Sequence, residues 1–360
     1  MNNLSKYLKQ AGKEGLNLAS SRKLSLLTAS FIFFAYTSLL NKFFGYSYQS
    51  IGVYGLKKQS NYLMNEERIG RVVGKVIKKI DLRQSIRDLV TILNKHKVII
   101  SKLDGENDPF VVLKTLSEIY PKVLMQVGFY NSIMRYISNN KKIAASFGAS
   151  VKLIGENKDI TADFIYNKIE PLLDRTVKKI GRKNGFNGDI LKFLTLAELN
   201  KYIKQKKLSR KQIDDLVARR KGYFYISLGN KDTIFVGKNI VDRVDAHFSA
   251  KDIRKGNVIS GISAYPGLVK GRVYKTFHGL KLSKPGYVLV TNITKPSDAP
   301  YLKKFSAIVT DEGGILSHVA VISRELKIPC IMSTKIATKV LKNNTLVEVN
   351  ANKGIVKILK

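Results

Sequence analysis

The stretch TDEGGILSHVAVISRELKIP, residues 310–329, decides how the C-terminal part of this chain is interpreted. The short apolar run just before it, 306–310, predicts a strand. Gly313 and Gly314 then predict a turn that lets the backbone approach a neighbour closely or adopt a positive φ. Ser317 is a preferred N-cap residue, so we expect a helix from about 317 to 326 with His318 in its first turn.

This placement gives His318 a chemical setting. Free backbone N–H groups and the positive end of the helix dipole converge at a helix start, where an anion on or near the imidazole would be stabilised. The same position should lower the pKa of His318, which keeps one ring nitrogen unprotonated and nucleophilic at neutral pH. From these residues alone, a phosphate-handling histidine and an ordinary surface histidine after a common glycine turn both fit the pattern.

Working outward, the flanking sequence predicts a compact α/β domain over 256–360. Period-two or β-branched runs favour strands, and glycines punctuate them. The strands are expected at 258–262, 268–274, 287–291, 306–310, 329–332, 346–349 and 354–358, with a short helix near 335–341.

The preceding residues predict a mostly α-helical domain over 1–222 and a linker over 223–255. Asp108 followed by Pro109 is typical of a helix start, and Thr161 is expected to cap another helix. Thr195 with Glu198 and Ser209 with Gln212 each match a capping box. The fold class expected for the whole chain is therefore α+β multidomain.

Residues 310–329 closely resemble the phosphohistidine loop of the phosphoenolpyruvate-utilising enzymes. This family includes phosphoenolpyruvate synthase, pyruvate phosphate dikinase, the first enzyme of the sugar phosphotransferase system and rifampicin phosphotransferase. The family pattern is matched by Thr310, Gly313, Gly314, Ser317, His318, Arg324, Glu325, Ile328 and Pro329. The flanks GISAYPGLVKGRV (261–273), 286–310 and ATKVLKNNTLVEVNANKGIV (337–356) resemble the rest of the domain.

The resemblance implies a swivelling β/β/α domain in which His318 carries a phosphoryl group between two active sites. It further implies that Thr310 hydrogen-bonds near the ring and orients it. Gly313 and Gly314 would make space for the phosphate, and Ser317 would cap the helix. Arg324 would either neutralise the phosphate in a docked state or hold the domain together.

The chain departs from the family at Leu316, where the dikinases and several relatives have a threonine, and the Leu-Ser-His form is closer to the synthase and rifampicin-phosphotransferase branches. The segment 193–226 resembles the helices that precede the mobile domain in those branches. We find no ATP-grasp domain and no pyruvate barrel. The resemblance thus implies an ATP-grasp partner or similar phosphoryl donor, with ATP and Mg²⁺ (or phosphoenolpyruvate) at the partner's site. It also implies a small-molecule acceptor.

Composition limits the other classes of function. The net charge is +36, from 63 Lys and Arg against 27 Asp and Glu, but no nucleic-acid-binding motif accompanies it, so nucleic-acid binding is disfavoured. Cys330 is the single cysteine and the four histidines are scattered, so we expect no disulfide, no metal site and no bound cofactor, in a cytoplasmic protein.

The uncharged run 24–40, LSLLTASFIFFAYTSLL, is at the short limit for a membrane span. Its Ser, Thr and Tyr residues favour a buried helix over membrane association. The alternatives to a phosphotransferase component are an idle scaffold or binding protein, and a basic protein associated with membrane or nucleic acid.

Overall fold

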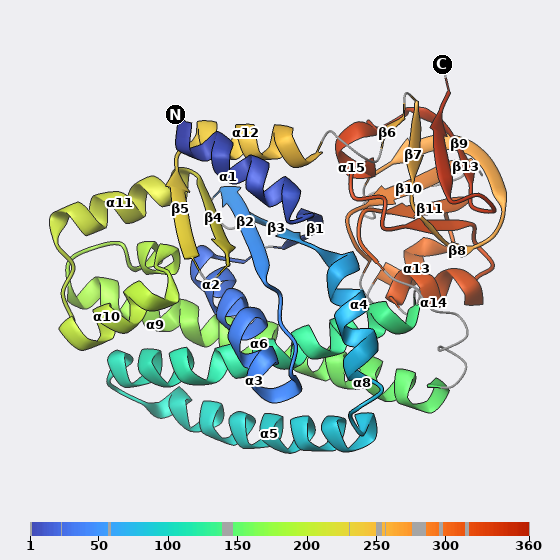
Figure 1. The fold of residues 1–360 in the computed structure, drawn as a ribbon. Helices are drawn as coiled ribbons and strands as arrows, with labels where there is room; N and C mark the ends of the chain where they lie inside the picture. Colours follow the sequence, from blue (N-terminus) through green and yellow to red (C-terminus); the bar gives the residue numbers. More distant parts are fainter. Residues whose placement is uncertain are drawn as a thin grey trace. The chain divides into compact units, whose positions relative to one another are not determined.

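The computed structural model describes residues 2–22, 24–56, 59–138, 147–229, 231–249, 254–255, 257–275, 286–294, 298–313 and 317–359. The chain divides into two compact units, unit 1 (Met1–Val244) and unit 2 (Asp245–Lys360). Each unit has its own sheet together with helices (Figure 1), so the chain is an α+β multidomain protein, as expected from the sequence.

The helices of unit 1 pack around α6. It contacts α2, α4, α8 and α9, while α5 contacts α6 and α8 (Figure 1). The helices are α1 (Asn2–Lys13), α2 (Leu26–Phe34), α3 (Leu40–Phe44), α4 (Glu66–Val76), α5 (Leu82–Lys102), α6 (Pro109–Ser138), α8 (Gly148–Phe164), α9 (Glu170–Lys183), α10 (Leu196–Gln205), α11 (Arg210–Lys221) and α12 (Lys238–Ser249), the last of which ends in unit 2.

Most of the predicted helix starts are confirmed. The Asp108 carboxylate accepts from the N–H of Phe110 at 2.9 Å, directly before α6. Both capping boxes form, Thr195 with Glu198 at α10 and Ser209 with Gln212 at α11. The expected cap at Thr161 is wrong, because this residue lies inside α8 and its hydroxyl donates to the carbonyl of Asn157 at 2.6 Å.

The predicted linker over 223–255 is wrong for most of its length, because this segment completes unit 1. The unit has a five-stranded antiparallel sheet in the order β1 (Asn17–Arg22), β3 (Gln59–Met64), β2 (Ser50–Leu56), β4 (Tyr223–Leu228) and β5 (Lys231–Val236). Every residue of β4 is buried, so the strand pairs in the middle of the core rather than connecting two domains.

The apolar run near the N-terminus forms one continuous helical stretch, Leu26–Phe44, made of α2, a π-helical turn (Ala35–Leu39) and α3. It is the one helix among the described residues that is long and apolar enough to cross a membrane. Most of its α2 side chains are buried in the core of unit 1, where the ring of Phe31 packs at a tilt against that of Tyr120 at a centroid distance of 5.4 Å. In this structure it packs as a core helix.

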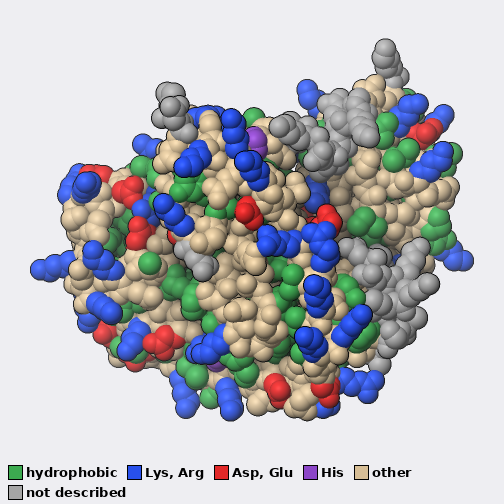
Figure 2. Space-filling model, in the orientation of Figure 1, with side chains coloured by type: hydrophobic (Ala, Val, Ile, Leu, Met, Phe, Trp, Pro, Cys, Tyr) green, Lys and Arg blue, Asp and Glu red, His purple; other side chains and the backbone are tan. Residues whose placement is uncertain are grey.

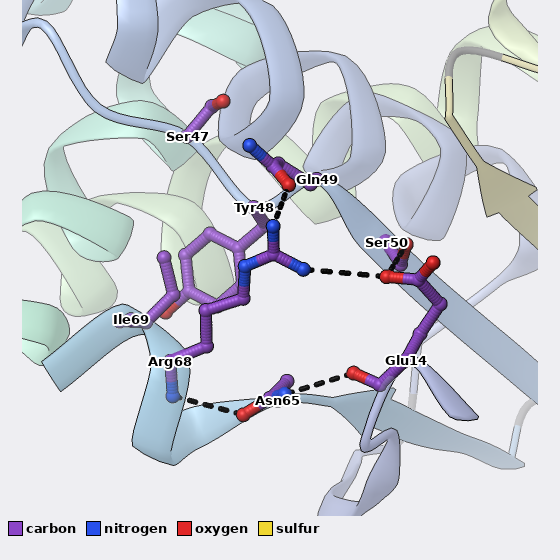
Figure 3. Close-up of a pocket in the computed structure, with 8 residues that line it drawn as sticks. All are labelled: Glu14, Ser47, Tyr48, Gln49, Ser50, Asn65, Arg68 and Ile69. Atoms are coloured by element: carbon purple, nitrogen blue, oxygen red, sulfur yellow. Dashed lines mark hydrogen bonds and ion pairs between the residues drawn. The ribbon is translucent and has the colours of Figure 1, made fainter. Parts of the chain in front are cut away.

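A polar cluster joins α1, β2 and α4 within unit 1 (Figure 3). Arg68 pairs with Glu14 at 3.3 Å and also bonds to Gln49, while the amide of Asn65 donates to the carbonyl of Glu14 at 2.8 Å. The cavity that these side chains line is about 10 Å³, roughly the space for one water molecule. The cluster therefore ties the N-terminal helix to the sheet rather than enclosing a ligand.

Unit 2 is built on a nine-stranded sheet in which four consecutive strands, β9, β10, β11 and β12, run parallel. The sheet order is β6 (Arg254–Lys255), β7 (Val258–Ser260), β14 (Ile355–Ile358), β13 (Leu346–Asn350), β9 (Leu268–Tyr274), β10 (Tyr287–Thr291), β11 (Ala307–Thr310), β12 (Cys330–Met332) and β8 (Ile262–Tyr265). Its helices are α13 (Ala299–Leu302), α14 (His318–Glu325) and α15 (Ala337–Val340).

Alternation along the parallel strands gives this sheet two buried faces. Val288 and Val290 of β10 enter one hydrophobic cluster with residues of β13 and β14, whereas Leu289 enters another with residues of α13 and α14. Helices α13 and α14 cover the face of Leu289, while the short helix α15 packs with β13 and β14 against the face of Val288 and Val290 (Figure 1).

Lys and Arg side chains are spread over the displayed surface, over helices and strands alike (Figure 2). A nucleic-acid-binding surface usually gathers its basic residues into a patch or stripe. The displayed face carries its positive charge in scattered positions instead.

The 3-10 turn Gly188–Phe193 packs closely against α9, and a substitution at Gly188 can test this packing. A Cβ atom on Gly188 would lie 1.9 Å from the carbonyl oxygen of Val177, which is backbone and has little freedom to move. We expect Gly188→Ala to lower the free energy of unfolding in urea by about 2–3 kcal/mol.

Gly155 in α8 provides the matched control, because a Cβ atom there meets nothing within 4 Å. Gly155→Ala should raise the free energy of unfolding by about 0.5–1 kcal/mol, since alanine restricts the unfolded chain more than glycine does. Equal stability of the two variants would contradict the packing described here.

Candidate functional site

Two loops meet at one edge of the unit 2 sheet because β10 and β11 are parallel. Thr291, the last residue of β10, pairs in register with Thr310, the last residue of β11. Parallel neighbours end at the same edge, so the chain leaving β10 and the chain leaving β11 emerge side by side. The first segment carries Thr294, and the second leads through Gly313 to His318.

His318 is the first residue of α14, as predicted, and its side chain is half-buried. Ser317 occupies the N-cap position with extended backbone angles, and its carbonyl accepts from the N–H of Val321 at 3.0 Å. Its hydroxyl makes no capping hydrogen bond and instead faces the sulfur of Met332 at 3.8 Å. The predicted position of Ser317 is confirmed, but the predicted side-chain cap is wrong.

The imidazole is held by Thr294, a residue that the sequence analysis did not single out. The Thr294 hydroxyl lies 3.0 Å from His318 Nδ1, and Thr294 is buried. This contact occupies one ring nitrogen and leaves Nε2 as the other. A single sequence gives no periodicity or capping signal for Thr294, because it follows the end of a strand in an irregular loop.

Thr310 does not have the partner that the family resemblance implied. Its hydroxyl donates to the carbonyl of Glu312 at 2.6 Å, and its own carbonyl accepts from the N–H of Thr334 at 3.1 Å. Thr310 is fully buried at the end of β11, so it shapes the start of the loop. The orientation of the ring comes from Thr294 instead.

The glycine pair is described in part. Gly313 has φ +135°, and a Cβ atom there would lie 3.1 Å from the Ser317 hydroxyl, so the turn favours glycine at this position. Gly314 and Leu316 lie outside the described residues. The Gly313 carbonyl accepts a hydrogen bond from the hydroxyl of Ser333.

The loop after β11 is further fixed by the carboxylate of Asp311, which is buried. Asp311 accepts from the hydroxyl of Thr334 at 2.8 Å, and from the backbone N–H of Thr338 at 3.1 Å. Beside it, Glu312 accepts from the amide of Asn292 at 3.1 Å, which links the two loops directly. These supporting residues were also missed, because the sequence shows only that Asp and Glu follow a strand.

The pKa of His318 is lowered, as the sequence predicts, but the main physical cause differs from the predicted one. Burial lowers the pKa of His318 below its usual value, and the charges of Asp298 and Glu325 oppose this with smaller effects. Partial desolvation, rather than the helix start alone, therefore favours the neutral imidazole. A neutral ring has an unprotonated nitrogen that can act as a nucleophile.

Arg324 lies in the last turn of α14 and is exposed. It is six positions after His318 in the sequence, which is about 9 Å along a helix axis. Its charge acts on the buried Cys330. Burial raises the pKa of the Cys330 thiol to about 12, although a hydrogen bond with Ser323 and the charge of Arg324 each lower this pKa by a smaller amount. Both roles considered for Arg324 stay predictions.

Two exposed apolar side chains flank the histidine. Val321 is one helical turn after His318 and is 42% exposed, and Ile293 precedes Thr294 and is 45% exposed. Residues three apart on a helix share a face, so Val321 lies on the side of α14 that carries the imidazole. Among the described residues, no group of three or more His, Cys, Asp or Glu side chains is arranged to hold a metal ion.

Comparison with known proteins places these residues in a family. Residues 283–354 match the model of the "PEP-utilising enzyme, mobile domain". That segment contains β10, β11, α14 and the loops that carry Thr294 and His318.

Curated relatives are similar to this chain over a segment of about 110–120 residues. A probable phosphoenolpyruvate synthase of Archaeoglobus fulgidus is 41% identical over 118 residues, which is 32% of this chain and 16% of that protein. The phosphoenolpyruvate synthase of Pyrococcus furiosus is 44% identical over 110 residues, which is 30% of this chain and 14% of that protein. The chain therefore matches only about one seventh of the length of these relatives.

Solved structures give weaker likenesses. The holo-form of aconitase X from Thermococcus kodakaraensis covers 29% of this chain at 22% identity with a TM-score of 0.23, and an Enzyme I structure covers 72% at 16% identity with a TM-score of 0.21. From the family model and the curated relatives, the chain contains a mobile domain of the phosphoenolpyruvate-utilising enzymes, and this part of the chain is similar to phosphoenolpyruvate synthases.

Proposed function

We propose that His318 is a phosphoryl carrier, which accepts a phosphoryl group at one site and donates it at another. The contact of the Thr294 hydroxyl with His318 Nδ1 at 3.0 Å carries the proposal, because it fixes the ring and leaves Nε2 for chemistry. Unit 2 then corresponds to a swivelling phosphohistidine domain, and the chain is one component of a phosphotransferase.

The chemistry needs a neutral imidazole at the start. Nε2 attacks the phosphorus of a phosphoanhydride or of phosphoenolpyruvate, the P–N bond forms, and the P–O bond to the leaving group breaks. The ring proton stays on Nδ1 and donates to the Thr294 hydroxyl. In the second step the acceptor oxygen attacks phosphorus, the P–N bond breaks, and the neutral imidazole returns.

The start of α14 suits the charged intermediate. Because the Ser317 side chain makes no capping bond, it satisfies none of the first-turn N–H groups of the helix. Such N–H groups, with the positive end of the helix dipole, stabilise a phosphate dianion. The missing cap is thus consistent with a helix start that serves an anion.

The donor and the acceptor belong to the proposal as partners. We propose an ATP-grasp nucleotide-binding protein or domain as donor, with ATP and Mg²⁺ (or phosphoenolpyruvate) bound there, and a small molecule as acceptor. The exposed Ile293 and Val321 would be covered when the donor site closes over His318, which excludes water from the phosphoryl group. A cytoplasmic location, where these phosphoryl donors occur, completes the proposal.

The first prediction concerns the carrier itself. Incubation with labelled ATP and the ATP-grasp partner, or with labelled phosphoenolpyruvate, should give a label that acid removes and base does not. His318→Ala should abolish the label because the attacking nitrogen is lost. His96→Gln in α5 is the control and should keep it. A label that persists in His318→Ala, or the absence of any label with both donors, would refute the carrier role.

The second prediction concerns Thr294 as a positioning residue. Thr294→Val keeps the shape but removes the hydroxyl, so we expect labelling to slow about five- to tenfold, the equivalent of one lost hydrogen bond. Thr294→Ser should restore most of the rate. The ring ¹⁵N shifts of His318 should show a mixture of tautomers in Thr294→Val alone. An unchanged rate with an unchanged tautomer would contradict the assignment.

The third prediction follows from the lowered pKa of His318. Since the neutral ring is the nucleophile, the labelling rate should stay constant as pH falls to the usual histidine pKa of about 6.5 and decline only below it. Asp298 raises this pKa, so Asp298→Asn should move the decline to still lower pH. A shift of the decline to higher pH in Asp298→Asn would show that the electrostatic description is wrong.

A further inference from the structure

The segment that follows β12 has a strained backbone at two positions. Ser333 has φ +57° and Lys335 has φ +63°, which lie in the left-handed region that residues other than glycine rarely adopt. Thr334, between them, is fully buried. Strain of this kind persists only where the surrounding structure holds it, and it is found most often at functional sites.

The chain on both sides of Ser333 is fixed to the sheet. On one side, Met332 is fully buried as the last residue of β12. On the other side, the N–H groups of Thr334 and Lys335 donate to the carbonyls of 310–311, at the end of β11, each at 3.1 Å. Ser333 joins these two attachments, which accounts for its left-handed backbone.

Met332 and Ser333 also contact the loop that leads to His318. The Ser333 hydroxyl donates to the carbonyl of Gly313. The Ser317 hydroxyl donates to the sulfur of Met332 at 3.8 Å, and a Cβ atom on Gly313 would lie 3.4 Å from the Cβ of Met332. Two consecutive residues after the buried part of β12 therefore hold Gly313 and Ser317, and Ser317 directly precedes the histidine.

Stability alone gives little reason for a serine at position 333. A glycine would adopt the same φ without strain, although it would lack the hydroxyl that reaches Gly313. The gain from one neutral hydrogen bond is similar in size to the cost of one left-handed residue, so the two effects nearly cancel. What the serine adds is a fixed position for the Gly313 carbonyl.

We propose that Ser333 is a positioning residue for phosphoryl transfer at His318. It fixes the Gly313 carbonyl and, through it, the loop and the helix start that present the imidazole. Met332 supports the Ser317 end of the same loop more weakly, because a thioether sulfur is a poor acceptor. This role rests on the proposed carrier function of His318 and adds a residue that acts on the ring from a distance.

Three variants of the full chain separate the hydroxyl from the backbone. Ser333→Ala removes the hydroxyl and keeps the strain, and Ser333→Gly removes both. Each should be labelled at His318 about three- to fivefold more slowly, the equivalent of one lost hydrogen bond. Ser333→Asn should recover part of the rate, because asparagine tolerates a left-handed φ and has a donor amide. A normal rate in Ser333→Gly would show that the hydroxyl is not needed and would overturn the proposal.

The ring of His318 provides a second readout that needs no phosphoryl donor. In unlabelled Ser333→Ala and Ser333→Gly, the ring ¹⁵N shifts should show a mixture of tautomers, because the contact between Thr294 and Nδ1 is loosened. Unchanged shifts in both variants would refute the positioning role. If the unaltered chain takes no label, the carrier proposal fails, and the ring shifts still decide whether Ser333 positions the imidazole.

Lys327 provides the matched control, because it has φ +53° in the turn after α14 and is exposed. Of Lys327→Ala and Lys327→Gly, the glycine variant should have the higher unfolding temperature, as should Ser333→Gly relative to Ser333→Ala. The labelling rate and the ring shifts of both Lys327 variants should equal those of the unaltered chain. If they slow labelling as much as the Ser333 variants do, the effect reflects a general loss of stability and the positioning role is wrong.

Discussion

The parallel pairing of β10 with β11 is the constraint on which the candidate site depends. It aligns Thr291 with Thr310, so the two following loops leave the sheet at one edge. An antiparallel pair would send those loops to opposite ends of the strands, about four residues or roughly 13 Å apart. With the parallel register, Thr294 reaches His318 Nδ1 and Asn292 reaches Glu312, and each of these bonds connects segments about 20 residues apart in the sequence.

The sequence was sufficient to predict most of unit 2. The strands expected at 268–274 and 287–291 coincide with β9 and β10, and the helix expected from 317 begins at His318. These elements are short, bounded by glycine or proline, and buried on both faces or alternating, which is the pattern that local rules describe. The partner of the imidazole was not predictable in this way, because Thr294 reaches the ring only through tertiary structure, and the family resemblance pointed to Thr310.

Less of the tertiary structure of unit 1 could be predicted from the sequence. Its helices were foreseen where side chains cap them, but its sheet was not, because strands from distant parts of the chain form it. β2 pairs with β4 across about 170 residues, and both strands are buried on both faces, so neither shows a two-residue alternation. The sequence shows Thr195 and Glu198 as a capping box within one helix. In the structure Glu198 also forms an ion pair with Arg219 of the next helix. A local motif can therefore hide the residues that hold two helices together.

The helix start at Ser317 shows how a local rule is relaxed at the candidate site. A serine at the N-cap ordinarily contributes about 1 kcal/mol by accepting from a backbone N–H, and here its hydroxyl faces a methionine sulfur instead. The half-buried ring is also kept neutral at the expense of solvation. Both features cost stability, and both would be compensated by an anion bound to the imidazole, since it would engage the N–H groups and the dipole together. Departures from local consistency of this kind are expected where a structure serves chemistry rather than its own stability.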